Sequence, residues 1–274
     1  MKLGTMVYMA EDIGSGEAFR QLKELGFDTC QLVCWEEHRF TDAFADTVNR
    51  LTREFGITIT AFWCGYGPPT RFDFYEGPIT VGLVPAPYRL ARMETLIKAG
   101  TFAHKIGVTD VVTHAGFIPE NPNDPDYAGT ISALKEIARR YQPTGQYLLF
   151  ETGQETPITL LRTIQDMGME NVGVNLDPAN LILYGKANPV DALDTIGKWV
   201  RGVHAKDGNY PTDGRYLGEE TALGKGRVDF PRFIAKLKAL GYDGAITIER
   251  EISGEEQIKD ILDAKAVLEK LLEA

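Results

Sequence analysis

The chain has 274 residues, of which 43% are hydrophobic and 25% charged, a composition typical of a globular protein large enough to bury a full core. Lysine and arginine total 29 against 39 acidic residues, and the resulting net charge of -10 repels nucleic-acid phosphates and anionic membranes. No apolar run approaches the roughly 18 residues that a membrane-spanning helix needs. The three cysteines form no CxxC pair, and the first residues contain no apolar signal segment, so we expect a cytoplasmic protein.

Eight short runs rich in β-branched residues alternate with longer segments along the whole chain. The runs are predicted strands at residues 3–9, 29–35, 57–65, 110–116, 147–153, 172–177, 201–207 and 245–251. The intervening segments place apolar residues three or four apart, as Phe44, Val48, Leu51 and Phe55 do, which predicts amphipathic helices. Glycines in "ELGFD", "EFGIT", "KIGVT", "DMGME" and "ALGYD" mark the expected helix ends.

Eight strand-then-helix units predict an α/β protein folded as a (β/α)8 TIM barrel, with residues 1–274 in one domain. A doubly wound sheet is the rival, but it often carries a glycine-rich dinucleotide turn after its first strand. Here that turn, "YMAEDIGSGEAF", has only Gly14 and Gly16. The proline-rich stretch 65–87 is expected to lie in a loop between a strand and a helix.

Ligand-type side chains fall at the ends of four successive predicted strands, where a TIM barrel builds its active site. Glu151, Asp177 and Glu249 end the fifth, sixth and eighth strands, and His204 lies on the seventh. Alternation along each strand turns these side chains inward, while apolar neighbours such as Ile248 face the helices. Three converging carboxylates repel one another unless a cation neutralises them. We therefore predict one divalent metal ion, and the oxygen-rich set favours Mn2+, Mg2+ or Co2+ over a closed zinc site.

Motifs at these strands resemble the sugar phosphate isomerase/epimerase family of xylose isomerase-like barrels. They are "FETGQE", "NLDPAN", "GVHAKD" and "ITIERE", with "LGKGRVDFPRFIAKLKALGYDG" before the last. The resemblance implies that Glu151, Asp177, His204 and Glu249 bind the metal ion, with Mn2+ as first choice and Mg2+, Co2+ or Zn2+ as alternatives. It also implies that Glu151 and Glu249 transfer a proton next to a carbonyl through a metal-stabilised enediolate. The implied activity is that of an isomerase or epimerase acting on a keto-sugar, an inosose or a related polyol ketone.

Two positions depart from the ketose 3-epimerases of that family. Those enzymes carry a histidine where this chain has Asn180, and they lack the lysine that stands here as Lys206. Lys206 is two residues from His204 and is expected to face the same cavity, as a catalytic group that neutralises an oxyanion or protonates a leaving hydroxyl. These departures argue against epimerase activity on a free ketose. The alternative activity is a lyase that begins with the same proton abstraction and then loses water or the aglycone of a 3-keto-glycoside.

Further polar and aromatic residues near the strand ends are candidates for substrate binding. His114 ends the fourth strand, and Glu155 either touches the substrate or caps the next helix. The rings of Trp35, His38 and Trp63 could pack against the apolar face of a sugar. The expected substrate-binding set is His114, Glu155, Asn180, Asp207, Trp35 and His38. Lys225 and Arg227 leave phosphate recognition open, but the acidic "REISGEEQ" after the eighth strand does not support it.

Two other functions are disfavoured by the same residues. An AP endonuclease on this barrel would need many histidines and a basic groove, whereas the chain has four histidines and a net charge of -10. A non-catalytic sugar-binding barrel would not need both Glu151 and Glu249. We expect a small sugar or polyol ketone as the ligand and no nucleic-acid or membrane partner, and we leave a homo-oligomer open.

Overall fold

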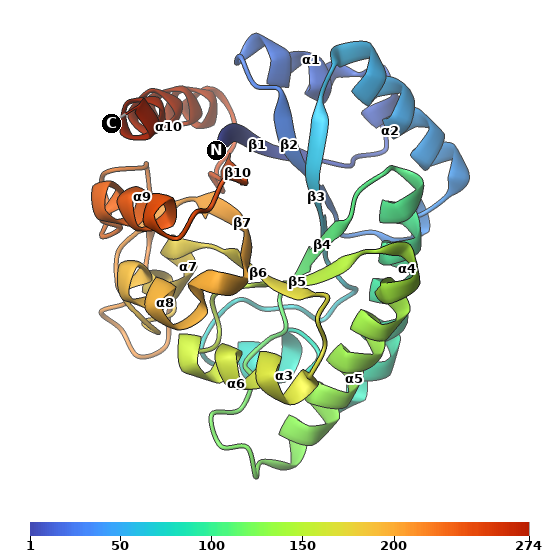
Figure 1. Ribbon diagram of the computed structural model, residues 1–274, viewed down its shortest axis with the longest axis vertical. Helices are drawn as coiled ribbons and strands as arrows, with labels where there is room; N and C mark the ends of the chain where they lie inside the picture. Colours follow the sequence, from blue (N-terminus) through green and yellow to red (C-terminus); the bar gives the residue numbers. More distant parts are fainter. Residues whose placement is uncertain (274) are drawn as a thin grey trace.

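A closed barrel of eight parallel strands organises the computed structural model, which describes residues 1–273 (Figure 1). The strands follow the order β1-β10-β7-β6-β5-β4-β3-β2 around the barrel, which confirms the predicted (β/α)8 architecture. Strands β8 (Asp207–Gly208) and β9 (Glu220–Thr221) form a separate small sheet. The barrel strands are β1 (Lys2–Tyr8), β2 (Thr29–Cys34), β3 (Thr58–Cys64), β4 (Asp110–Thr113), β5 (Tyr147–Glu151), β6 (Val172–Leu176), β7 (Val200–Ala205) and β10 (Ala245–Ile248).

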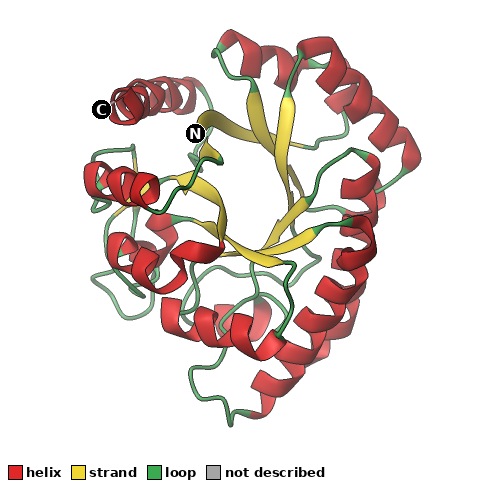
Figure 2. Ribbon diagram, viewed as in Figure 1, coloured by secondary structure: helices red, strands yellow, loops and turns green. Residues whose placement is uncertain are grey.

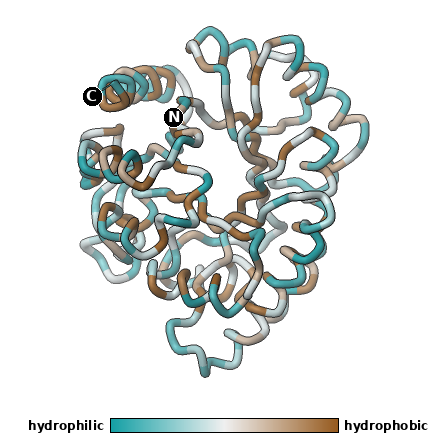
Figure 3. The backbone as a smooth tube through the Cα atoms, viewed as in Figure 1, coloured by the Kyte–Doolittle hydropathy of each residue, from teal (hydrophilic) through white to brown (hydrophobic). Residues whose placement is uncertain are grey.

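Helices surround the barrel on its outside (Figure 2). Polar and apolar stretches alternate along them in Figure 3, as expected where one face of a helix packs on the strands. Within residues 1–273, no helix has both the length and the apolar character needed to cross a membrane. The helices are α1 (Glu17–Glu24), α2 (Asp42–Phe55), α3 (Gly77–Thr80), α4 (Ala86–Lys105), α5 (Pro125–Tyr141), α6 (Pro157–Met167), α7 (Pro178–Leu183), α8 (Pro189–Ile196), α9 (Phe230–Ala239) and α10 (Glu255–Glu273).

Local sequence signals set the helix boundaries. Helix α2 begins after Thr41, whose side chain accepts a hydrogen bond from Phe44 N, and ends at Gly56 with φ of 63°. The stretch 65–87 is not loop throughout, because it contains α3 and the start of α4. Pro87 does not prevent this, since proline is well tolerated in the first turn of a helix.

Several strands end earlier than the sequence suggested. Strand β10 stops at Ile248, so Glu249 follows the strand, although Glu249 N still donates to Ala205 O at 3.2 Å. Asp177 likewise follows β6 and is the N-cap of α7. These chain segments leave the sheet at the carboxyl end of the barrel, which places their side chains around its opening.

The barrel interior contains both apolar and polar side chains. An apolar cluster of Val33, Ala61, Trp63, Val112 and Leu149 fills part of it. Polar side chains that are buried inside the barrel include Gln31, Asn175 and Thr247. Buried polar groups of this kind need hydrogen-bond partners, and Gln31 and Asn175 bond to each other.

Candidate metal centre and active-site cavity

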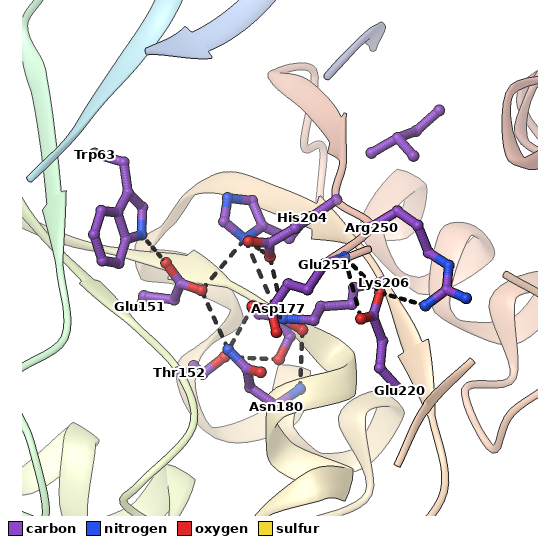
Figure 4. A network of polar contacts seen from close by, with 12 residues as sticks. Trp63, Glu151, Thr152, Asp177, Asn180, His204, Lys206, Glu220, Arg250 and Glu251 are labelled. Carbon is purple, nitrogen blue, oxygen red and sulfur yellow. Dashed lines mark hydrogen bonds and ion pairs between the residues drawn. The ribbon is translucent and has the colours of Figure 1, made fainter. Parts of the chain in front are cut away.

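Four side chains predicted to bind a metal ion converge at the carboxyl end of the barrel. One ligand atom from each of Glu151, Asp177, His204 and Glu249 lies within 4.8 Å of the others. Nδ1 of His204 is 3.0 Å from Oε2 of Glu249, 3.4 Å from Oε1 of Glu151 and 3.7 Å from Oδ2 of Asp177. Figure 4 shows His204 and Asp177 close together, with Glu151 reaching toward them. The cluster of four side chains that the sequence predicted is therefore present in the structure.

The hydrogen bonds around His204 test whether the cluster suits a cation. Gln31 Nε2 donates to Asn175 Oδ1 at 2.9 Å, which leaves Gln31 Oε1 as an acceptor 2.9 Å from Nε2 of His204. The proton of a neutral imidazole then lies on Nε2, and the Nδ1 lone pair faces carboxylate oxygens. Among the described residues, Nδ1 of His204 and Oδ2 of Asp177 have no hydrogen-bond partner. Lone pairs that face one another in a buried site fit a divalent metal ion.

Asp177, the first residue of the motif "DPAN", is held in position through both its side chain and its backbone. Oδ1 accepts from Asn180 N at 2.9 Å, so one carboxylate oxygen caps α7 and the other faces the cluster. Thr152 Oγ1 accepts from Asp177 N at 2.9 Å and donates to Asp177 O at 2.8 Å. Pro178 begins the helix without needing an amide hydrogen bond. Asp177 is thus held in place by its neighbours.

Glu151 is held by neutral donors at the end of β5. Its Oε2 accepts a hydrogen bond from the Trp63 indole, and its Oε1 accepts from Asn180 Nδ2 at 3.2 Å (Figure 4). His114 Nε2 lies 3.8 Å from the same Oε1. Burial disfavours the carboxylate, but positive charge on the imidazoles of His204 and His114, when these are protonated, lowers the pKa of Glu151 below its ordinary value.

Glu249 is held differently, beside the buried ammonium of Lys206. Lys206 Nζ lies 3.5 Å from Oε2 of Glu249, 3.8 Å from Oδ2 of Asp177 and 2.7 Å from Oε1 of Glu251. Burial opposes both charges, yet the carboxylates raise the pKa of Lys206 and Lys206 lowers the pKa of Glu249. Lys206 is only 2% exposed and lies behind the cavity wall.

A cavity of about 630 Å3 opens above the cluster. Glu151 and Glu249 line it, whereas Asp177 and His204 lie beneath its surface. The aromatic residues expected near a sugar contribute in part, since Trp35 and Trp63 belong to the lining. The complete lining is Met6, Tyr8, Val33, Trp35, Trp63, Phe72, His114, Glu151, Asn180, Leu183, Tyr184, Leu217, Glu249, Arg250, Glu251, Ile252, Ser253 and Gln257.

Three candidates for substrate binding lie elsewhere. His38 Nε2 is 3.0 Å from Oε1 of Glu11, its side chain is 65% exposed, and it is not part of the cavity wall. Asp207 accepts hydrogen bonds from the backbone of residues 208, 224, 226 and 228, so it holds the loop before α9. Glu155 is buried outside the cavity lining, where burial raises its pKa to about 8, and Thr156 caps α6 instead.

Sequence reasoning missed several residues that shape this region. Gln31 is the most important, and its signal was a polar side chain within the otherwise apolar strand "TCQLVC". Arg250 is ion-paired with Glu220 at 3.1 Å and with Asp260 at 2.8 Å, which ties the segment after β10 to its surroundings. The Glu251 side chain reaches Lys206, a contact that no spacing rule indicates.

Comparison with known proteins agrees with this architecture. The model of the family described as xylose isomerase-like TIM barrel matches residues 19–271. The crystal structure of a xylose isomerase domain protein from Planctomyces limnophilus is 32% identical, with a TM-score of 0.91 over 99% of this chain and 98% of that chain. A D-tagatose 3-epimerase-like protein is 24% identical, with a TM-score of 0.75 over 100% and 97% of the two chains, a level that shows the fold alone.

Among curated proteins, "Uncharacterized protein MJ1311" from Methanocaldococcus jannaschii is 26% identical over 286 aligned positions, which cover 100% of this chain and 90% of the relative. The family match spans nearly the whole barrel and includes all four residues of the cluster. The chain belongs to the family of xylose isomerase-like TIM barrels.

Proposed function

We propose that the protein is a divalent-metal-dependent isomerase or epimerase acting on a keto-sugar, an inosose or a related polyol ketone. The observation that carries this proposal is that Glu151 and Glu249 both line the cavity and both lie within 3.4 Å of His204 Nδ1. When bound at this cluster, a divalent cation would supply Lewis-acid polarisation of a substrate carbonyl. Membership of the xylose isomerase-like family supports the assignment.

The two glutamates would exchange a proton with the carbon next to that carbonyl. They come from β5 and from the end of β10, which are separated in the barrel by β6 and β7, so they approach the cavity from different directions. Trp63 and Asn180 orient Glu151, and Lys206 holds Glu249 as a carboxylate. One carboxylate can remove the proton while the other returns it, and the ammonium of Lys206 favours negative charge developing nearby.

The charges around the cavity support an uncharged substrate. Three carboxylates line it, those of Glu151, Glu249 and Glu251. In the described part of the chain, Arg250 is the one cationic side chain in the lining, and Glu220 and Asp260 already pair with it. A phosphate group would meet no unpaired cationic side chain among the described residues of this lining, so a phosphorylated sugar is disfavoured.

A lyase is the second candidate, because elimination begins with the same proton abstraction. The observation that favours it is the ammonium of Lys206, 3.5 Å from Oε2 of Glu249. Since Lys206 lies behind the cavity wall, its proton would reach a departing oxygen through the Glu249 carboxylate, which does line the cavity. The isomerase comes first because neighbouring carboxylates raise the pKa of Lys206 and so hold its proton.

Deuterium exchange combined with product analysis tests both activities. The Mn2+-loaded protein would be incubated in D2O with a panel of ketoses, inososes and keto-glycosides, and the products would be examined by NMR and mass spectrometry. An isomerase or epimerase yields deuterated isomers, whereas a lyase yields dehydrated products or a released aglycone. Absence of exchange with every member of the panel, in protein that has bound its metal, would contradict the proposed function.

A further inference from the structure

A continuous wall of rings leads from Glu151 to the mouth of the cavity. We call Trp35, Trp63, Phe72 and His114 the aromatic wall. Ring centroids of Trp63 and Trp35 are 5.0 Å apart, those of Trp35 and Phe72 6.2 Å, and those of Phe72 and His114 5.5 Å. Trp63 is 6% exposed and contacts Glu151, whereas Phe72 is 39% exposed. The wall therefore runs from the reacting centre to solvent.

The outer half of this wall is held in position by the fold. Trp35 packs against Trp63 and makes an edge contact with Tyr66, whose ring is 6.4 Å away. A Cβ atom at position 65 would overlap the Trp35 ring, so Gly65 is needed for this close approach. The part of the apolar surface that Trp35 contributes is consequently formed before any ligand binds.

Sugar hydroxyls are poorly matched to this outer half. Trp63 already donates its indole proton to Glu151, and Phe72 has no polar atom. A hydroxyl placed against the faces of the Trp35 and Phe72 rings would lose water without gaining a comparable partner, which costs free energy. The one polar group of these two side chains, the Trp35 indole N–H, lies at the ring edge and not on its face. An apolar group placed there would instead gain from leaving water.

The volume of the cavity also favours a substrate that is larger than one sugar ring. Its volume of about 630 Å3 lies in the range of roughly 300–1,000 Å3 that buries drug-sized ligands, which are larger than one sugar ring. A ring that reaches Glu151 and Glu249 would leave the region beside Trp35 and Phe72 to another part of the substrate.

We propose that Trp35 and Phe72 form an apolar subsite for the aglycone of an uncharged glycoside, preferably an aromatic one. The preferred substrate is then a keto-glycoside, the substituted form of the keto-sugar proposed above. This inference rests on the proposed function for the position of the sugar ring over the metal centre. Recognition of the substituent itself depends only on the aromatic wall.

Calorimetric titration of the Mg2+-loaded protein with matched glycosides tests the subsite. The probes are phenyl and methyl glycosides of glucose and galactose, in both anomers, together with the free sugars. We expect at least one phenyl glycoside to bind about tenfold more tightly than its methyl partner. In Trp35→Ala and Phe72→Ala this preference should disappear, while Tyr75→Ala, whose residue is 79% exposed in the same loop, should retain it.

The outcomes separate this inference from the proposed function. Equal binding of every phenyl and methyl pair overturns the subsite, even if deuterium exchange occurs with free ketoses. A phenyl preference that survives in Trp35→Ala and in Phe72→Ala also overturns it. A phenyl preference without deuterium exchange for any ketone contradicts the proposed function and leaves the subsite supported. Because Phe72 is 39% exposed and lies in a loop, we expect Phe72→Ala to fold even if Trp35→Ala does not.

Discussion

Oε1 of Gln31 lies 2.9 Å from Nε2 of His204, and this contact determines which imidazole nitrogen faces the carboxylates. A methionine at position 31 would keep the volume but remove the acceptor. We predict that Gln31→Met weakens Mn2+ binding about 10- to 100-fold, as is typical when a partner of a metal-binding histidine is lost. Calorimetric titration of metal-stripped protein with Mn2+ measures the effect.

The matched control for that substitution is Gln146→Met. Gln146 is also buried, but its amide donates to Gly100 O and Val108 O, away from the metal centre. This variant should lose stability and retain its Mn2+ affinity. Equal losses of affinity in the two variants would mean that Gln31 has no particular role toward His204.

Glu151 and Glu249 should each be indispensable for turnover. Glu151→Gln or Glu249→Gln removes a base and weakens one of the four ligands, so we expect deuterium exchange to fall by at least about 10²- to 10⁴-fold. The rates should be measured with Mn2+ in excess, and circular dichroism should show an unchanged fold. Near-native exchange in either variant would refute the assignment of the proton-transfer pair.

Metal removal should destabilise the fold. Three carboxylates and His204 lie within 4.8 Å of one another, so their mutual repulsion is relieved by a bound cation. At a hundredfold excess over the dissociation constant, Mn2+ should raise the free energy of unfolding by about 2.7 kcal/mol. Urea unfolding with and without chelator provides the comparison, and coincident curves would argue against a metal centre.

Glu155 should make stability depend on pH. Its pKa is raised by burial from 4.5 to about 8 in the folded protein. Between these values the unfolded chain releases a proton that the folded protein retains, so the free energy of unfolding falls as pH rises. We predict that the contribution of Glu155 lowers the free energy of unfolding by on the order of 3 kcal/mol between pH 5 and pH 8, and that Glu155→Gln removes this decrease.

The comparison for Glu155 is Glu54→Gln, which changes an exposed carboxylate on α2. Urea unfolding of the three proteins at several pH values would separate the contributions. The wild-type protein and Glu54→Gln should lose stability in parallel, while Glu155→Gln should lose less. Parallel curves for all three would show that Glu155 is ionised in the folded state at neutral pH.

Strong periodic signals made the fold predictable from the sequence. Gly56, Gly168 and Gly241 adopt positive φ of 63°, 58° and 74°, and each follows a helix where the sequence marked one to end. Strand ends were less accurate because charged residues such as Glu249 continue an extended pattern after the sheet has ended. Hydrogen bonding to the neighbouring strand, which the sequence does not show, decides the boundary.

The cluster of Glu151, Asp177, His204 and Glu249 was predictable for a different reason. Parallel strands in a barrel bring their carboxyl ends together, so Glu151 and Asp177 needed only correct strand positions to be brought close. His38 lies on a short helical turn, and Asp207 bonds to a distant loop, so their positions depend on chain paths that no periodicity encodes. Gln31 meets His204 only because the barrel closes. The preferred metal, a cytoplasmic location and self-association stay predictions.

Closure of the barrel also limits how copies of this protein could join. Every one of its eight strands has a hydrogen-bonded neighbour on both sides, and within residues 1–273 only the two-residue β8 and β9 retain an unpaired edge. Extension of a sheet from one molecule into the next is therefore blocked at the barrel. An oligomer would have to be built from side-chain contacts between outer helices and loops, which can be altered without disturbing the chemistry inside.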